Sequence, residues 1–239
     1  MKLLYYVPAI GKNNLEKKHG FLLNNLRYIY DTIKQPFSVA INFYTVSEEI
    51  KSSVKALDFV EETYFYERPG VLTELFLTNP YGEKFATYDY ILFVLDDVSL
   101  INVDISDMIR IKEKYDIELL SPSILKSTHR FMNPAKGITL HNCLEVYVLL
   151  MRPVDYQRFC SIHTIENKWM WAVDFLFGYY KIKSGVVHKY VARHELPSSS
   201  NGGEAGRLMT QYLQQRTPFK TFNELCAAFT PVYNTIYEE

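Results

Sequence analysis

Two adjacent acidic residues, Asp96 and Asp97, follow Tyr88–Leu95, the run with the strongest strand pattern in the sequence. Adjacent carboxylates at the end of a buried strand repel each other unless a cation lies beside them. Divalent ions such as Mn²⁺ and Mg²⁺ prefer oxygen ligands, and the oxygens of a diphosphate can fill their open positions. Asp96 and Asp97 therefore predict a metal site, with the alternative that one of them caps a helix and the other is solvated.

A second candidate, Asp174, is the only acid of the aromatic segment Trp169–Phe175. A carboxylate in apolar surroundings has a raised affinity for protons, which suits a general base that deprotonates a hydroxyl group. Trp169 and Trp171 offer ring faces on which a sugar ring can stack. The alternative is that Asp174 only caps the backbone of the helix expected over Trp171–Tyr180.

His194 ends the apolar run Val186–His194, beside the Ser/Gly-rich stretch Pro197–Gly203. An imidazole nitrogen can complete a metal shell, but a single histidine is more often structural than a ligand. His188 lies in the middle of the same run, and we expect it in the core or on the surface.

Other candidates lie near the ends of expected strands and in a later loop. Those near the ends of expected strands are Pro8, Ala9, Arg68, Gly70 and Asp96. Arg68 can pair with a phosphate or stack on a base, and a plain surface role is equally open. Those in or near the later loop are Glu145, His129 and Arg130.

The elements that must position these residues alternate in the first half of the chain. Strand patterns cover Lys2–Ala9, Phe37–Val46, Val60–Tyr66 and Tyr88–Leu95, and helix patterns cover Asn14–Ile33, Ser47–Leu57, Leu72–Leu77 and Asp104–Tyr115. Such alternation predicts an α/β fold with a mostly parallel, doubly wound sheet flanked by helices. In these sheets ligands bind at the carboxyl ends of the strands, which is where Asp96 and Asp97 would lie.

The second half of the sequence is less regular. Turn-forming residues predict a loop over Ser121–His141, and strands are expected over Ile117–Leu120, Leu144–Met151 and Val186–His194. Helices are expected over Asp155–Ile162, Trp171–Tyr180, Leu208–Gln215 and Phe222–Phe229. We find no internal repeat, so a single domain is the simplest interpretation.

Composition excludes some classes of function. The 239 residues are 48% hydrophobic and 22% charged, with a formal net charge of −1. Because the basic residues are dispersed along the chain, we expect no binding to nucleic acid. The three cysteines include no C-x-x-C pair and are expected to be free thiols in a reducing compartment.

The sequence shows no expected membrane or targeting segment. The apolar run that begins at Met1 is too short for a signal peptide, and no run approaches 18 apolar residues. We therefore expect a protein without a transmembrane segment, located in the cytoplasm, or in the host cytoplasm if the protein is viral.

The order of these pieces resembles the GT-A glycosyltransferases, in which a Tyr-Asp-Tyr-Ile type of strand delivers acidic residues to a metal ion and a ribose. The commonest form has three acids after this strand, whereas here Leu95 stands at the first position and Asp97 at the metal-binding one. The resemblance implies that His194 completes the metal shell beside a mobile loop. It also implies that Asp174 is the catalytic base of an inverting transfer.

Over Tyr88–Gly203 the chain is similar to one GT-A-like group, found in plants, bacteria and large DNA viruses and long catalogued as being of unknown function. The viral members of this group are glycosyltransferase domains. The matching pieces are Leu144–Tyr147 with Arg152-Pro153, then Trp171–Phe175, and finally His194–Ser198. The first 80 residues support the resemblance only by the order of strands and helices.

This resemblance implies a metal-dependent enzyme that uses Mn²⁺ or Mg²⁺. It would move a sugar from a nucleotide-diphosphate donor, UDP-sugar foremost, to a glycan, glycoprotein or other hydroxyl acceptor. It further implies one GT-A-like domain over residues 1–239 with a smaller second sheet, in which residues 1–100 bind the nucleotide and residues 101–239 the acceptor. The residues that would then border the base and ribose are Pro8, Ala9, Arg68, Gly70 and Asp96. Those that would contact the acceptor are Trp169, Trp171, Glu145, His129 and Arg130.

Two other classes of function remain open from the sequence. A sugar nucleotidyltransferase would share the fold but usually has a glycine-rich basic loop, which Gly11-Lys12 alone does not supply. A non-catalytic protein that binds a sugar or a partner is favoured by the absence of an acid at Leu95. A serine or cysteine hydrolase has little support, because the sequence lacks G-x-S-x-G.

Overall fold

A computed structural model describes residues 1–45, 47–100, 102–125, 127, 129–196, 202–229 and 234–236, apart from the side chain of Arg130. Among these residues, no helix is long and apolar enough to cross a membrane. Residues 197–201 of the predicted Ser/Gly-rich loop lie outside the described part of the chain.

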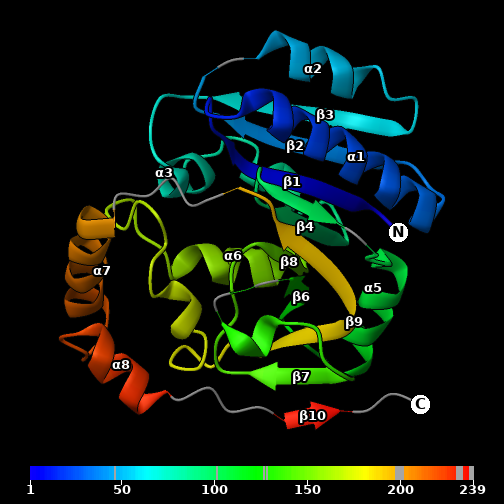
Figure 1. Cartoon of the computed structure of the whole chain (residues 1–239). Helices are drawn as coiled ribbons and strands as arrows, with labels where there is room; N and C mark the ends of the chain where they lie inside the picture. Colours follow the sequence, from blue (N-terminus) through cyan, green and yellow to red (C-terminus); the bar gives the residue numbers. More distant parts are fainter. Residues whose placement is uncertain are drawn as a thin grey trace.

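The first half of the sheet is parallel, as expected. Its strands run in the spatial order β3-β2-β1-β4, and every pair within it is parallel (Figure 1). The strands are β1 (Leu3–Ile10), β2 (Phe37–Phe43), β3 (Val60–Glu67) and β4 (Tyr90–Val94). β1 and β2 are buried along their whole length, which explains why their sequences are apolar runs without alternation.

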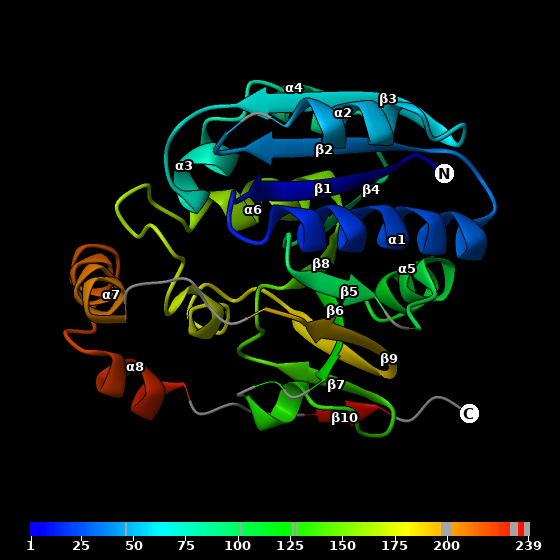
Figure 2. The same ribbon diagram turned by 45° about the horizontal axis from the view of Figure 1, so that its top comes forward.

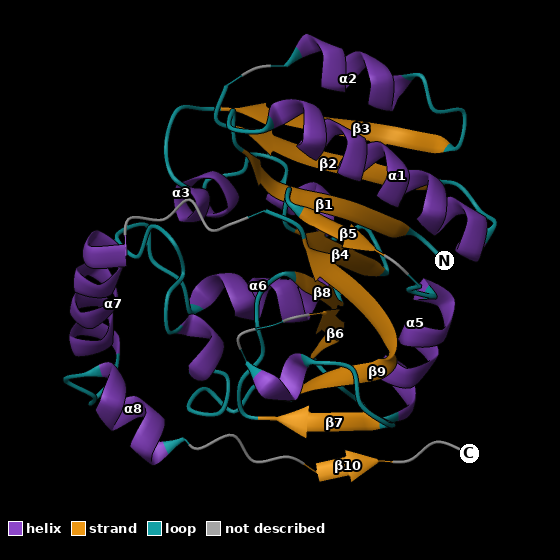
Figure 3. Cartoon of the chain, viewed as in Figure 1, coloured by secondary structure: helices purple, strands orange, loops and turns teal. Residues whose placement is uncertain are grey.

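The second half of the chain extends the same sheet. Antiparallel pairing of β8 with β4 continues the order through β6, β9, β7 and β10, and among the described strands of this half only β6 and β9 are parallel (Figure 3). The smaller second sheet is therefore continuous with the first, and β5 branches from β9. The strands are β5 (Val98–Leu100), β6 (Leu119–Leu125), β7 (Ile138–His141), β8 (Val148–Met151), β9 (Ser184–His194) and β10 (Asn234–Ile236).

Helices cover both faces of the sheet, which confirms the predicted α/β class. The side chains of Tyr5 and Tyr6, adjacent on β1, point to opposite faces. Tyr5 accepts a hydrogen bond from Asn25 of α1 (3.3 Å), and Tyr6 packs edge-to-face on Phe85 and on Tyr156 of α6. The helices are α1 (Leu15–Ile33), α2 (Glu48–Lys55), α3 (Leu72–Leu77), α4 (Gly82–Phe85), α5 (Ile105–Lys114), α6 (Pro153–Ser161), α7 (Gly202–Arg216) and α8 (Phe222–Ala228).

The helix predicted over Trp171–Tyr180 does not form. The segment contains only a short 3₁₀ turn, η2 (Val173–Phe175). Met170 and Ala172 have left-handed backbones, with φ of 61° and 67°, which interrupts the helical path just before Asp174. The predicted terminal helix over Leu208–Gln215 is longer than expected, since α7 begins at Gly202.

The loop predicted over Ser121–His141 is strand at both ends, in β6 and β7. β6 runs through Pro122 and pairs with β9, and the register shifts between Pro122 and Ser123. A proline is tolerated inside a sheet at such an irregularity, because the strand loses one ladder bond there in any case. The described residues between β6 and β7 include a second 3₁₀ turn, η1 (Arg130–Met132).

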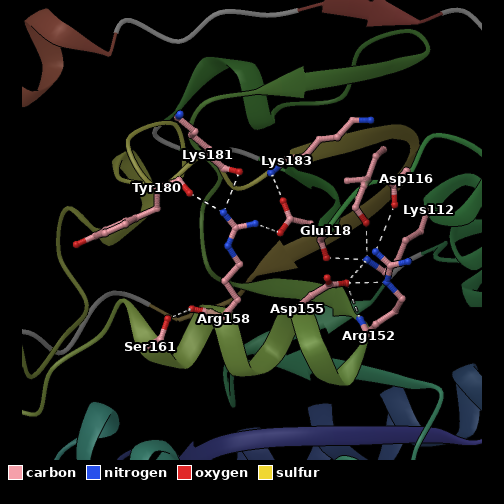
Figure 4. Close-up of polar contacts among 11 residues, drawn as sticks. Lys112, Asp116, Glu118, Arg152, Asp155, Arg158, Ser161, Tyr180, Lys181 and Lys183 are labelled. Carbon is pink, nitrogen blue, oxygen red and sulfur yellow. Dashed lines mark hydrogen bonds and ion pairs between the residues drawn. The ribbon is translucent and has the colours of Figure 1, made fainter.

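A buried lysine connects three elements below the sheet. Lys112 of α5 is fully buried, and its ammonium lies 2.8 Å from the Asp155 carboxylate of α6 (Figure 4). The same ammonium donates hydrogen bonds to the carbonyls of Ile117 and Glu118 at the start of β6. Arg152 donates its backbone N–H and its Nε to Asp155 at 3.0 and 3.2 Å. Burial lowers the pKa of Lys112, and the hydrogen bond to Asp155 opposes that shift.

We predict that Lys112→Met lowers the free energy of unfolding by about 3 kcal/mol or more, because the Asp155 carboxylate stays buried without its main counter-charge. The matched control is Lys34→Met, since Lys34 pairs with Asp31 while both side chains are about 70% exposed. Exposed pairs contribute about 1 kcal/mol at most. Urea unfolding measures both variants, and equal losses would contradict the assignment.

Candidate active site

A cavity of about 660 Å³ opens at the carboxyl ends of β1, β4 and β9. Its acidic, basic and imidazole lining residues are Asp96, Asp97, Glu145, Asp174, Lys18, His129 and His194. Its aromatic lining residues are Tyr44, Tyr147, Trp169, Trp171, Phe175 and Phe222. Figure 2 shows α7 and α8, which contribute Met209 and Phe222, on the side toward which β1, β2 and β3 point.

Most of the residues singled out in the sequence line this cavity. They are Ala9, Asp96, Asp97, His129, Glu145, Trp169, Trp171, Asp174 and His194. His188 is buried within β9, where its ring nitrogens lie 2.8 Å from the Ser123 hydroxyl and 2.7 Å from the Thr139 hydroxyl.

Three of the predicted nucleotide-binding residues do not line the cavity. Pro8 is buried within β1. Arg68 lies at the surface, where its guanidinium pairs with Glu74 of α3 at 2.7 Å. A side chain at Gly70 would meet the same carboxylate, since a Cβ there would lie 2.7 Å from Glu74. The side chain of Arg130 lies outside the described part of the chain.

Asp97 and His194 form a direct pair at the ends of β4 and β9. Nε2 of His194 lies 2.9 Å from Oδ2 of Asp97, and this contact raises the pKa of His194. The neighbouring Glu195 N–H donates to the Asp97 carbonyl at 2.9 Å, which fixes the two segments to each other. The Tyr147 ring stacks on the His194 imidazole with ring centres 4.6 Å apart. The imidazole is therefore held by contacts on its edge and on its face.

The Asp97–His194 pair suits a divalent ion in one respect. The second carboxylate oxygen of Asp97, Oδ1, is buried and has no hydrogen-bond partner among the described residues. A buried carboxylate oxygen without a partner is costly and is commonly satisfied by a cation or water. Within the described chain no cluster of three His, Cys, Asp or Glu side chains could hold a metal, so further ligands would have to come from substrate or water.

Asp96 is already engaged by the protein. Its Oδ2 lies 2.7 Å from Nζ of Lys18 and accepts the Gly11 N–H at 2.8 Å. Burial raises the pKa of Asp96, while Lys18 and the Gly11 N–H favour the charged form. The contact joins the end of β4 to the end of β1 and to α1, so Asp96 acts here as a link between elements.

Lys18 was not among the residues selected from the sequence, although the sequence contains a signal for it. Leu15, Lys18 and Leu22 share one face of α1, and Leu22 is buried. A lysine on the apolar face of a helix needs a buried partner, which is Asp96. Tyr147 was also missed, and nothing in its sequence context distinguishes it from a core tyrosine.

Asp174 lies beside an imidazole and a second carboxylate. Nε2 of His129 is 3.5 Å from Oδ2 of Asp174 and 3.7 Å from Oε1 of Glu145. The Ser127 hydroxyl donates a hydrogen bond to the other oxygen of Glu145 and accepts one from the backbone N–H of His129 at 3.0 Å. The hydrogen bond with Asp174 raises the pKa of His129. Asp174, Glu145 and His129 stand out separately in the sequence, whereas their contact and the part of Ser127 become visible only in the structure.

The rest of this end of the cavity is aromatic. Trp169 and Trp171 lie just before Asp174, and Trp171 is 38% exposed, which is unusual for so large an apolar side chain. Phe175 packs edge-to-face on Phe222 of α8 with ring centres 5.1 Å apart. Exposed aromatic faces beside polar groups are typical of sites that bind flat or ring-shaped ligands.

Several solved structures are similar to the chain over most of its length. TarS from S. aureus superposes with a TM-score of 0.56 at 15% identity, covering 94% of this chain and 45% of that one. TarS residues 1–349 in complex with UDP-GlcNAc give 0.60 at 16%, covering 96% and 72%. GalNAc-T7 with UDP, GalNAc and Mn²⁺ gives 0.59 at 7%, covering 90% and 47%.

The fold is that of the GT-A glycosyltransferases. The chain spans about half the length of TarS and of GalNAc-T7. No protein-family model and no curated protein sequence matches it. The similarity is thus one of fold, and the activity depends on the residues that line the cavity.

We predict that Lys18→Met lowers the free energy of unfolding by about 1–3 kcal/mol, because it removes the charged partner of a largely buried carboxylate. Lys17→Met is the matched control, since Lys17 is exposed on the next position of α1 and should change stability by about 0.5 kcal/mol or less. Urea unfolding compares the two, and a loss confined to Lys17→Met or shared equally would refute the link at Asp96.

Proposed function

We propose that the chain is a metal-dependent glycosyltransferase that moves a sugar from a UDP-sugar to a hydroxyl group of a glycan or glycoprotein. The observation that carries the proposal is a single cavity with two distinct carboxylate centres. One is Asp97 with His194 at the strand ends, and the other is Asp174 among aromatic rings. Group transfer needs both a site for the leaving diphosphate and a base for the attacking hydroxyl.

Residues 1–100 hold the nucleotide in this proposal. Ala9, Gly11 and Tyr44 line the cavity at the ends of β1 and β2, where doubly wound sheets bind nucleotides. TarS residues 1–349 bind UDP and UDP-GlcNAc, and GalNAc-T7 binds UDP. These neighbours make UDP the first nucleotide to test.

Asp97 and His194 would hold the metal ion, Mn²⁺ or Mg²⁺, through a carboxylate oxygen and an imidazole nitrogen. When bound, the ion would neutralise charge on the departing diphosphate. GalNAc-T7 is in complex with Mn²⁺, which supports a metal of this kind. Asp96 has no part in the metal shell in this proposal, because its carboxylate is paired with Lys18.

Residues 101–239 hold the acceptor. Trp169 and Trp171 stack on its sugar ring, and the Asp174 carboxylate takes the proton of its hydroxyl as that oxygen attacks the anomeric carbon. A base that activates the acceptor directly implies inversion at that carbon. A cytoplasmic location and membership of the plant, bacterial and viral group stay predictions from the sequence.

The second candidate function is a non-catalytic protein that binds a nucleotide-sugar or a glycan. It is favoured by Leu95, which lines the cavity where a further acid could lie, and by the pairing of Asp96 with Lys18. Metal-dependent release of UDP from UDP-GlcNAc decides between the two functions, since a binding protein would leave the donor intact.

We predict that Asp97→Asn weakens Mn²⁺-dependent binding of UDP by at least about 100-fold, since even changes outside the first ligand shell cost about 10–100-fold. His194→Ala should weaken it in the same direction. The control is Asp116→Asn, an acid whose side chain is 80% exposed and pairs with Arg152. Calorimetry with and without Mn²⁺ measures the effect, and equal UDP affinity in wild type and Asp97→Asn would refute the metal site.

We predict that Asp174→Asn lowers transfer, or hydrolysis of UDP-GlcNAc, by about 100-fold or more, the usual contribution of a general base. Binding of UDP with Mn²⁺ should be unchanged, because the amide keeps the shape of the side chain. The exposed Glu166 supplies the control Glu166→Gln. Near wild-type rates in Asp174→Asn, or a product that retains the donor's anomeric configuration, would show that Asp174 is not the base.

A further inference from the structure

The His129 imidazole lies between two carboxylates at the acceptor end of the cavity. Its Nε2 is 3.5 Å from Asp174 and 3.7 Å from Glu145. The Glu145 side chain is 6% exposed, whereas those of His129 and Asp174 are 28% and 19% exposed. One edge of the imidazole therefore faces a buried anion and a cavity-facing anion at once.

The surrounding contacts leave this imidazole little freedom to move away. The Ser127 hydroxyl accepts a hydrogen bond from the backbone N–H of His129 and donates one to the Glu145 carboxylate. The backbone of His129 is thereby connected to Glu145 through Ser127. Phe131 stacks on the imidazole with ring centres 5.5 Å apart, and Phe175 meets it edge-on at 5.2 Å. The two phenylalanine rings therefore hold the His129 imidazole beside Asp174.

The charges around His129 favour its cationic form. The contact with Asp174 is the largest cause that raises the pKa of His129, burial opposes it, and the charges of Asp174 and Glu145 add to the rise. Two other titratable groups nearby are neutral. Burial lowers the pKa of His141, which packs against Phe131, to about 4, and raises that of Cys143 to about 12. The charges that raise the pKa of His129 are those of Asp174 and Glu145.

We propose that His129 is a positioning residue for Asp174: its imidazolium orients the Asp174 carboxylate toward the acceptor, while Glu145 favours the cationic form of the imidazole. The inference rests on the proposed function, in which Asp174 is the base. Both side chains also line the cavity, so their binding of the acceptor stays a prediction from the sequence.

The proton balance assigns one role to each group. As the acceptor oxygen bonds to the anomeric carbon, its proton passes to Asp174, and the bond to the diphosphate breaks with its electron pair leaving on the diphosphate. His129 keeps its proton throughout and offsets the negative charge of Asp174 before the transfer. Asp174 later releases the proton to water.

The first experiment needs no substrate. NMR of the imidazole nitrogens, titrated with pH, should give His129 a pKa above its ordinary value in the wild type. The pKa should fall in Asp174→Asn and, by less, in Glu145→Gln, since each removes one anion. If His129 titrates at its ordinary value, or if Asp174→Asn does not lower it, the pairing does not exist in solution and the inference is overturned.

The second experiment measures kcat for UDP release from UDP-GlcNAc against pH. His129→Gln should lower kcat by about tenfold at pH values below the raised pKa of His129, where the wild-type imidazole is charged. The difference from wild type should shrink as pH rises through the raised pKa of His129, because the wild-type imidazole then loses its own charge. His129→Lys, which restores a cation, should recover most of the acid-side loss, with KM little changed.

The matched control is His19→Gln, because His19 also faces a carboxylate, Glu49, at 3.7 Å but lies on α1 away from the cavity lining. It should leave the pH profile unchanged. A loss in His129→Gln that is equal at every pH and not recovered by His129→Lys would mean a merely structural role and would overturn the inference. If wild type does not turn over UDP-GlcNAc while the NMR titration behaves as expected, the proposed function fails for this donor and the His129–Asp174 pairing stands.

Discussion

Repulsion between carboxylates is the constraint on which the cavity depends. Four acidic side chains line it, and a half-buried site cannot hold that much negative charge without compensation. Three of them lie against a cation or an imidazole from another element, in the pairs Asp96–Lys18, Asp97–His194 and Asp174–His129. The fourth, Glu145, shares His129 and is hydrogen-bonded by Ser127. Pairing of this kind lets the acids converge at one edge of the sheet.

The partners of these acids come from distant parts of the chain. Lys18 lies on α1, His194 at the end of β9, and His129 in the segment between β6 and β7. The cavity can therefore exist only when the sheet has formed from β1 through β9. Beneath the sheet, a carboxylate is likewise compensated by a cation from another element, since Lys112 of α5 pairs with Asp155 of α6. Lys112 also donates to the Glu118 carbonyl just before β6, so it holds α6 and β6 against α5.

The pairs differ in how readily a ligand could enter them. One oxygen of Asp96 is held by two donors, Lys18 and the Gly11 N–H, and this contact joins β1 to β4. If a metal ion replaced these donors, the edge of the sheet would lose that connection. Asp97 has one imidazole partner and a second oxygen without one among the described groups, which leaves it suited to a cation. Since the structural neighbours share only 7–16% of their residues with this chain, such local differences carry the functional argument better than the fold does.

The sequence alone determined the parallel half of the sheet and the residue types that could do chemistry there, because buried strands and an amphipathic helix leave periodic patterns. Asp97, Asp174 and His194 could be selected because they end or interrupt such patterns. Only the tertiary structure decided that Lys18 forms an ion pair with Asp96. It also decided that the left-handed backbones of Met170 and Ala172 interrupt the helix expected around Asp174. Pro122, expected in a loop, lies in a strand because β6 pairs with β9. These outcomes depend on contacts between residues far apart in the chain, which local periodicity does not encode.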